Sequence, residues 1–203
     1  MATNFYKEVE GIYRLRVPFE NIYTSVFLIT ENEKNILVDC ATTPDDVDLH
    51  IVPALKALGL ETSDISAIVI THKHGDHAGG LERILELEPR IEVVREARAV
   101  TECISTCALN GHTLDCIGIL DCRTCTLISG DAIQGAGVDK YRCSLKDKNA
   151  YLETIECIRR DIDNGKIENI LFSHAYEPWD SDRAIGALTS LSCLKDAVSY
   201  FLF

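Results

Sequence analysis

Residues 71–77, THKHGDH, place three imidazoles and one carboxylate within a single short segment of the chain. They follow ISAIVIT (65–71), a β-branched run typical of a strand that is buried on both faces. Open α/β sheets place their ligand sites in loops at the carboxyl ends of strands. Imidazole and carboxylate ligands favour borderline cations such as zinc, iron or manganese. The segment therefore predicts a metal site directly after a buried strand.

The stretches around this segment predict two similar halves, each β-rich and then α/β. Before the segment, a capped helix is expected from Thr43 to Leu58, and strands are expected over residues 11–17, 24–30 and 35–40. After it, we expect a helix over 81–88 and a strand over 91–94. The second half is predicted to hold strands over 116–121, 125–129 and 169–172, and helices over 149–162 and 182–200. The pattern predicts the α/β class and one domain spanning residues 1–203.

The segment THKHGDH resembles the H-x-H-x-D-H signature of the metallo-β-lactamase superfamily. Further matches to that family follow in the expected order along the chain, namely a strand ending in Asp39, Gly111-His112-Thr113, Ser129-Gly130-Asp131 and Ser173-His174. The resemblance implies a four-layer αββα sandwich with metal ions along one edge of its two sheets.

The same resemblance implies two divalent metal ions, with zinc expected and iron or manganese as alternatives. It assigns three histidines to the first ion: His72, His74 and His112. It assigns three side chains to the second ion: Asp76, His77 and His174. Asp131 would bridge the two ions, and Asp39 would support the site without binding metal.

This ligand set implies a hydrolase that needs no serine or cysteine nucleophile. A water bridging two such ions would lose a proton near neutral pH, and the hydroxide would attack a small ester, thioester, lactone or phosphoester. Asp76 is the candidate catalytic residue, because it could orient the hydroxide or relay its proton. Tyr176, close behind His174, is a candidate substrate-binding residue.

Two departures from the family pattern indicate which kind of superfamily member the sequence resembles. Asp131 stands where antibiotic-hydrolysing members carry cysteine or serine, so the pattern is similar to thioesterases, lactonases and phosphodiesterases, not to true β-lactamases. The interval from His77 to His112 is shorter than usual, which predicts an altered, more open pocket that a second subunit of a homodimer could close. Two alternatives remain: a mononuclear iron oxygenase of the persulfide dioxygenase type, and a non-catalytic binding protein of the same fold.

Composition limits the binding partners and the cellular compartment that we expect for the protein. A formal net charge of −12 argues against nucleic acid, and small-molecule substrates are expected instead. The N-terminal stretch lacks a basic region followed by an apolar one, and no apolar run is long enough for a membrane span, so we expect a cytoplasmic protein without a membrane partner. The odd count of nine cysteines suits reduced thiols. Whether a second metal or redox site exists stays open for Cys103, Cys107, Cys122 and Cys125.

Overall fold

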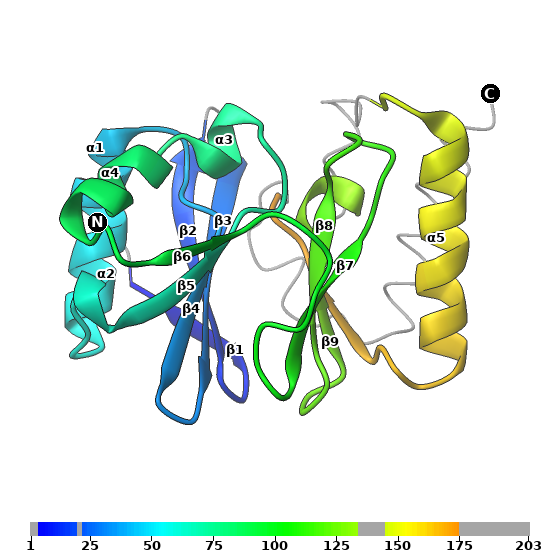
Figure 1. The fold of residues 1–203 in the computed structure, drawn as a ribbon, viewed down its shortest axis with the longest axis horizontal. Coiled ribbons are helices and arrows are strands. Elements are labelled where there is room, and N and C mark those ends of the chain that lie inside the picture. The colour runs from blue at the N-terminus through cyan, green and yellow to red at the C-terminus, as the bar shows by residue number, and fades with distance from the viewer. Residues whose placement is uncertain (1–3, 20–21, 134–144, 175–203) are drawn as a thin grey trace. The chain divides into compact units, whose positions relative to one another are not determined.

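The strands of the protein form two separate sheets in the computed structural model, which describes residues 4–19, 22–133 and 145–174 (Figure 1). The chain divides into two compact units, residues 1–95 and 96–203. Each unit contributes one sheet and the helices that cover one of its faces. A single domain over residues 1–203 stays a prediction.

The first unit holds a six-stranded sheet. Its strands, in spatial as well as chain order, are β1 (Tyr6–Val9), β2 (Ile12–Phe19), β3 (Ile22–Glu31), β4 (Lys34–Val38), β5 (Ile65–Val69) and β6 (Glu92–Val94). Neighbours are antiparallel from β1 to β4 and parallel from β4 to β6. The predicted strands are confirmed, whereas β1 was not predicted.

The helices of this unit follow the parallel strands. They are α1 (Pro44–Asp46), the π-helix η1 (Val47–Ile51), α2 (Val52–Ala57), the 3-10 turn η2 (Thr62–Asp64), α3 (Gly75–Ala78) and α4 (Leu81–Leu87). Thr43 caps α1, because its hydroxyl accepts the Asp46 amide while the Asp46 carboxylate accepts the Thr43 amide. The predicted helix after Thr43 is confirmed, with a π-helical segment inside it.

One face of the first sheet carries the core that holds these helices. Val47, Ile51 and Leu55 are buried in one cluster with sheet residues such as Leu28 and Leu37. Figure 1 shows α1, α2 and α4 on the same face of this sheet. Burying such side chains stabilises the unit by roughly 1.5–3 kcal/mol each. The end of β5, from which the histidine segment leaves, is therefore held in a packed sheet.

The second unit holds a four-stranded sheet in the order β10-β9-β8-β7. Its elements are β7 (Ile104–Ala108), β8 (Ile117–Asp121), β9 (Thr126–Ile128), the 3-10 turn η3 (Gly130–Ala132), α5 (Lys148–Asp163) and β10 (Asn169–Leu171). β10 lies parallel to β9, and the other neighbours are antiparallel. β8, β9, α5 and β10 confirm the prediction, and β7 was not predicted.

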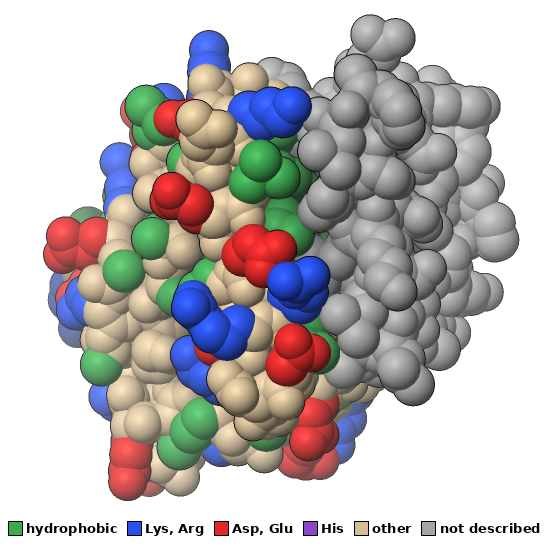
Figure 2. All heavy atoms as spheres, turned by 90° about the vertical axis from the view of Figure 1, so that its right-hand side faces the viewer, with side chains coloured by type: hydrophobic (Ala, Val, Ile, Leu, Met, Phe, Trp, Pro, Cys, Tyr) green, Lys and Arg blue, Asp and Glu red, His purple; other side chains and the backbone are tan. Residues whose placement is uncertain are grey.

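Helix α5 covers one face of the second sheet (Figure 1). The Asp147 side chain caps it by accepting the amides of Asn149 (2.9 Å) and Ala150 (3.0 Å). Ile155 and Ile158 lie on its buried side, in one cluster with sheet residues. The described part of the face seen in Figure 2 carries acidic and basic side chains side by side.

Two predictions about helices concern the rest of the chain. The helix expected over residues 182–200 lies outside the described residues. No helix within residues 4–19, 22–133 and 145–174 has the length and apolar composition that crossing a membrane requires.

Candidate metal centre

The predicted ligands of the first unit lie on the loop after β5 and on the short helix α3. His72 is in the loop and His74 is the N-cap of α3, while Asp76 and His77 lie within that helix. The His72 and His77 side chains are buried, whereas Lys73 between His72 and His74 is exposed. Lys73 thus faces solvent, whereas the imidazoles of His72 and His77 are covered by protein.

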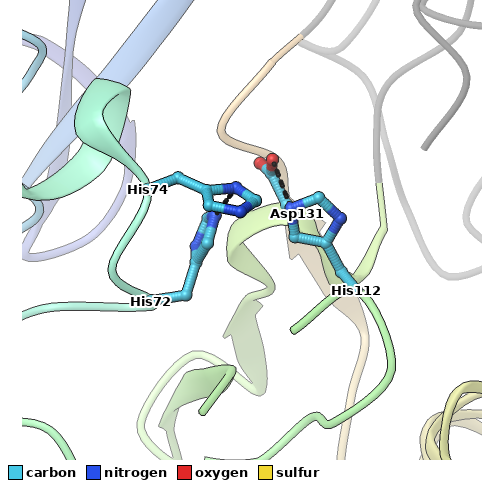
Figure 3. A group of neighbouring side chains, drawn as sticks. All are labelled: His72, His74, His112 and Asp131. Atoms are coloured by element: carbon cyan, nitrogen blue, oxygen red, sulfur yellow. Dashed lines mark hydrogen bonds and ion pairs between the residues drawn. The ribbon is translucent and has the colours of Figure 1, made fainter. Parts of the chain in front are cut away.

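Ring nitrogens and a carboxylate of this segment come together in two pairs. His72 Nε2 lies 3.0 Å from His74 Nδ1 (Figure 3). His77 Nε2 lies 3.5 Å from Asp76 Oδ2. A separation of 3.5 Å is long for a hydrogen bond between nitrogen and a carboxylate oxygen. Both pairs therefore present donor atoms that can share a cation.

Asp39 orients the imidazole of His77 through a hydrogen bond from Nδ1. Its fully buried carboxylate receives a hydrogen bond from His77 Nδ1 (2.8 Å), and it also accepts the Thr71 amide (2.8 Å). A carboxylate only accepts, so His77 must carry its proton on Nδ1 and leave the Nε2 lone pair available. Asp39 has a positive φ of 62°, which aspartate tolerates better than most residues. The supporting role predicted for Asp39 agrees with this geometry.

Thr71 is a supporting residue that the sequence interpretation missed. Its hydroxyl lies 2.8 Å from Asp39 Oδ2 and 3.2 Å from His72 Nδ1. Because the hydroxyl proton goes to the carboxylate, the oxygen can accept from His72 Nδ1, which leaves the His72 Nε2 lone pair exposed toward His74. The only sequence signal for this role is the position of Thr71 immediately before the first histidine.

The predicted ligands of the second unit lie on three loops at strand ends. His112 is in the loop between β7 and β8, Asp131 is in η3 directly after β9, and His174 follows β10. All three residues are buried, with exposed fractions of 3–5%. Buried polar side chains of this kind need partners, and Asp131 contacts both histidines.

The carboxylate of Asp131 lies between the two histidines of its unit. Its Oδ2 atom lies 3.5 Å from His112 Nε2, the contact drawn in Figure 3, and its Oδ1 atom lies 3.3 Å from His174 Nε2. Each oxygen therefore faces a different imidazole at a distance longer than a typical charge-assisted hydrogen bond. This arrangement suits a carboxylate that binds two cations.

The loop that carries His112 is anchored to the start of α5. The Gly111 carbonyl accepts the amides of Lys146 (2.9 Å) and Asp147 (3.1 Å). Gly111 has a φ of 136°, and a Cβ atom there would lie 2.5 Å from the Cα atom of Tyr151. Only glycine fits this contact. The glycine before the histidine in the predicted Gly-His-Thr match therefore has a steric reason.

Neighbouring thiols do not enlarge the ligand set. The Cys116 side chain lies 3.1 Å from the Thr113 hydroxyl, and burial raises the pKa of its thiol. Across the described residues, no group of three or more potential ligands includes a cysteine. A second metal site made by Cys103, Cys107, Cys122 and Cys125 is thus not supported by this part of the chain. Tyr176, the predicted substrate-binding residue, lies outside the described residues.

Known proteins resemble this chain in sequence. A sequence model of the metallo-β-lactamase superfamily matches residues 21–99. A β-lactamase-like protein 2 homolog from Caenorhabditis elegans is 27% identical over 164 residues, which cover 70% of this chain and 54% of the relative. The chain thus spans about half the length of this curated relative.

Solved structures agree with the chain over nearly its whole length. The mono-zinc form of the metallo-β-lactamase FIM-1 from Pseudomonas aeruginosa superposes with a TM-score of 0.75 at 16% identity, covering 98% of this chain and 96% of that one. An N-acyl homoserine lactone hydrolase with product bound at its catalytic metal centre gives a TM-score of 0.66 at 18% identity, covering 89% and 97%. These likenesses confirm the predicted α/β sandwich fold. In its sequence match over residues 21–99, its fold and its histidine motif, the chain resembles the metallo-β-lactamase superfamily.

Proposed function

We propose that the protein is a metal-dependent hydrolase with two divalent cations in its active site. The observation that carries this proposal is the placement of Asp131. Its two carboxylate oxygens face two different buried imidazoles, those of His112 and His174. A carboxylate held in this way can offset the repulsion between two cations roughly 3.5–4 Å apart.

The proposed ligand sets follow the pairing within each unit. His72 and His74, which face each other in the first unit, would bind one ion together with His112. The pair formed by Asp76 and His77 would bind the other ion together with His174. Asp131 would bridge the two ions. The nitrogen-rich, thiolate-free set favours zinc, iron or manganese over magnesium or calcium.

The side chains of the protein would orient this centre and manage a proton. Asp39 holds His77 in one tautomer, and the Thr71 hydroxyl does the same for His72. The Asp76 side chain is 17% exposed, so it can exchange a proton with solvent while it contacts His77. When bound, divalent cations would lower the pKa of water and polarise a substrate oxygen. The proposed substrates are small esters, thioesters, lactones or phosphoesters.

Metal content is the first test of this proposal. Inductively coupled plasma mass spectrometry of protein purified without chelators is expected to find close to two metal ions per chain. Asp131→Asn should lower that content, since the amide loses the charge and one ligand oxygen, while Asp163→Asn on the exposed end of α5 should leave it unchanged. Two ions retained in Asp131→Asn would contradict the bridging role.

Activity is the second test. The substrates to screen are p-nitrophenyl esters, thioesters, lactones and bis-p-nitrophenyl phosphate. Their hydrolysis should fall by orders of magnitude in Asp131→Asn, and chelation of the wild-type protein should abolish it. His112→Gln should lose metal and activity together, whereas His50→Gln, in the π-helical segment, should lose neither. One iron per chain with oxygen consumption would instead identify the oxygenase alternative.

A further inference from the structure

Cys103 and Cys122 lie opposite each other at one end of the β7–β8 pair. Ile104 is paired with Asp121 in this antiparallel ladder, and the next step of the register brings Cys103 to Cys122. The Cys122 amide donates to the Cys103 carbonyl at 3.1 Å, which continues the ladder by one bond. Two residues far apart in the sequence are thus adjacent in the sheet.

This position matches the geometry of a disulfide bond. Opposed residues in an antiparallel pair have Cα atoms about 4.5–5.5 Å apart, and disulfides join Cα atoms about 4.4–6.8 Å apart. Both side chains carry thiols, with Cys122 exposed and Cys103 half-buried. A reagent in solution can therefore reach the pair without unfolding of the sheet.

We propose that Cys103 and Cys122 form a reversible disulfide by exchange with a low-molecular-weight disulfide. One cysteine, as thiolate, attacks a sulfur of the small disulfide, whose S–S bond breaks and releases one thiolate. The second cysteine then attacks the protein sulfur of this mixed disulfide, forms the intramolecular S–S bond and expels the second small thiolate. Both cysteines are oxidised, the small disulfide is reduced to two thiols, and their protons come from the two cysteines.

The other thiols of the unit are less suited to this exchange. Cys107 lies opposite Gly118, which has no side chain, and its thiol donates to the Gly118 carbonyl. Burial raises the pKa of Cys107 to about 11, so little of it is thiolate. Cys125 lies beyond the ladder in the turn that follows β8, with a positive φ of 49°. Of the four cysteines for which a redox site was left open, Cys103 and Cys122 are therefore the best placed to form a bond.

A disulfide bond between Cys103 and Cys122 would affect the candidate metal centre. The proposal of this bond does not depend on the proposed function. The bond would close a loop from residue 103 to residue 122, and this loop contains His112. Closing a loop reduces the freedom of the unfolded chain. Oxidation would therefore restrain the strand pair whose connecting loop carries a candidate ligand, at the end of the strands opposite that ligand.

The test is disulfide mapping of the full chain. The protein is equilibrated with a buffer of oxidised and reduced glutathione, blocked with N-ethylmaleimide and digested with trypsin and chymotrypsin without reduction. Trypsin cuts after Arg98 and Arg123, and chymotrypsin can cut after Leu109 and Leu120, so Cys122 and Cys125 lie on separate peptides. Cys103 and Cys107 share the peptide of residues 99–109, and tandem mass spectrometry shows which of the two carries the N-ethylmaleimide adduct. Mass spectrometry should find the peptides of Cys103 and Cys122 joined, and dithiothreitol should release them.

Variants make the result specific. Cys103→Ser and Cys122→Ser should each abolish the joined peptides, while Cys157→Ser, which removes an exposed thiol of α5, should keep them. Oxidation should raise the Tm by roughly 5 °C in the wild type and in Cys157→Ser only. Glutathione adducts without the joined peptides, or a bond that maps to Cys125 or Cys107, would overturn the proposal.

Discussion

Replacing Asp39 should reveal how much of the first unit depends on one buried carboxylate. Asp39→Ala removes the acceptor for the Thr71 amide and for His77 Nδ1, each at 2.8 Å. Both donors are buried, and an unsatisfied buried donor costs roughly 1–3 kcal/mol. Alanine is also strained at a φ of 62°, by roughly 1 kcal/mol. We expect the free energy of unfolding to fall by about 4 kcal/mol.

The variant Asp39→Asn removes the negative charge of the side chain while keeping its size and shape. Asparagine tolerates a positive φ and keeps one acceptor oxygen, so the expected loss is only about 1–2 kcal/mol. Its amide nitrogen cannot accept from His77 Nδ1, so the imidazole loses the partner that fixes its tautomer. Metal affinity should therefore fall by roughly 10–100-fold even though the fold survives.

Urea unfolding of the chelator-treated protein, followed by circular dichroism, measures the stability change without contribution from metal. Glu33→Gln, in the exposed turn between β3 and β4, is the matched control and should change stability by less than about 0.5 kcal/mol. A loss below about 1 kcal/mol in Asp39→Ala would refute the reasoning, because water or a rearranged neighbour would then satisfy both donors.

Three further changes test other parts of the structure. Gly111→Ala should destabilise the protein by roughly 3 kcal/mol in urea unfolding, since its Cβ would lie 2.5 Å from Tyr151 Cα; a neutral effect would contradict this contact. Asp147→Ala should lower the Tm through a loss of about 1 kcal/mol at the N-cap of α5; restoration by Asp147→Ser would confirm capping. Arg90 holds the pKa of Glu88 at about 2, so this pair stabilises the fold above the ordinary pKa of 4.5 and loses its effect as the pH falls through about 2. An NMR titration of the Glu88 carboxyl should show the pKa rising toward 4.5 in Arg90→Gln.

Much of the fold could be predicted because local patterns agreed with the final structure. The β-branched run of β5 and the 3.6-residue pattern of α5 gave strong signals, and both elements lie within two residues of the expected bounds. β7 has the sequence ISTCA, whose mixture of polar and small residues carries little strand signal, so only its ladder with β8 reveals it.

The candidate site could be predicted only in its ligands. THKHGDH concentrates them in one segment, and the later matches stand at strand ends where such groups are expected. The contact of Asp39 with His77 and the hydroxyl of Thr71 between them depend on how β4 lies beside β5. Such pairing between strands leaves no periodic pattern in the sequence. The family resemblance implied a supporting role for Asp39 but did not identify His77 as its partner.

The attachment of the His112 loop to the residues just before α5 would make their amides a reporter of cation binding at His112. The Gly111 carbonyl accepts two amides that precede the helix, and the Thr154 hydroxyl donates to the Asn110 carbonyl at 2.8 Å. Any cation that immobilises His112 therefore also resists opening of this turn. Hydrogen exchange at the amides of Lys146 and Asp147 would slow on metal addition. Metal occupancy could then be followed from backbone protection, without a spectroscopic signal from the metal.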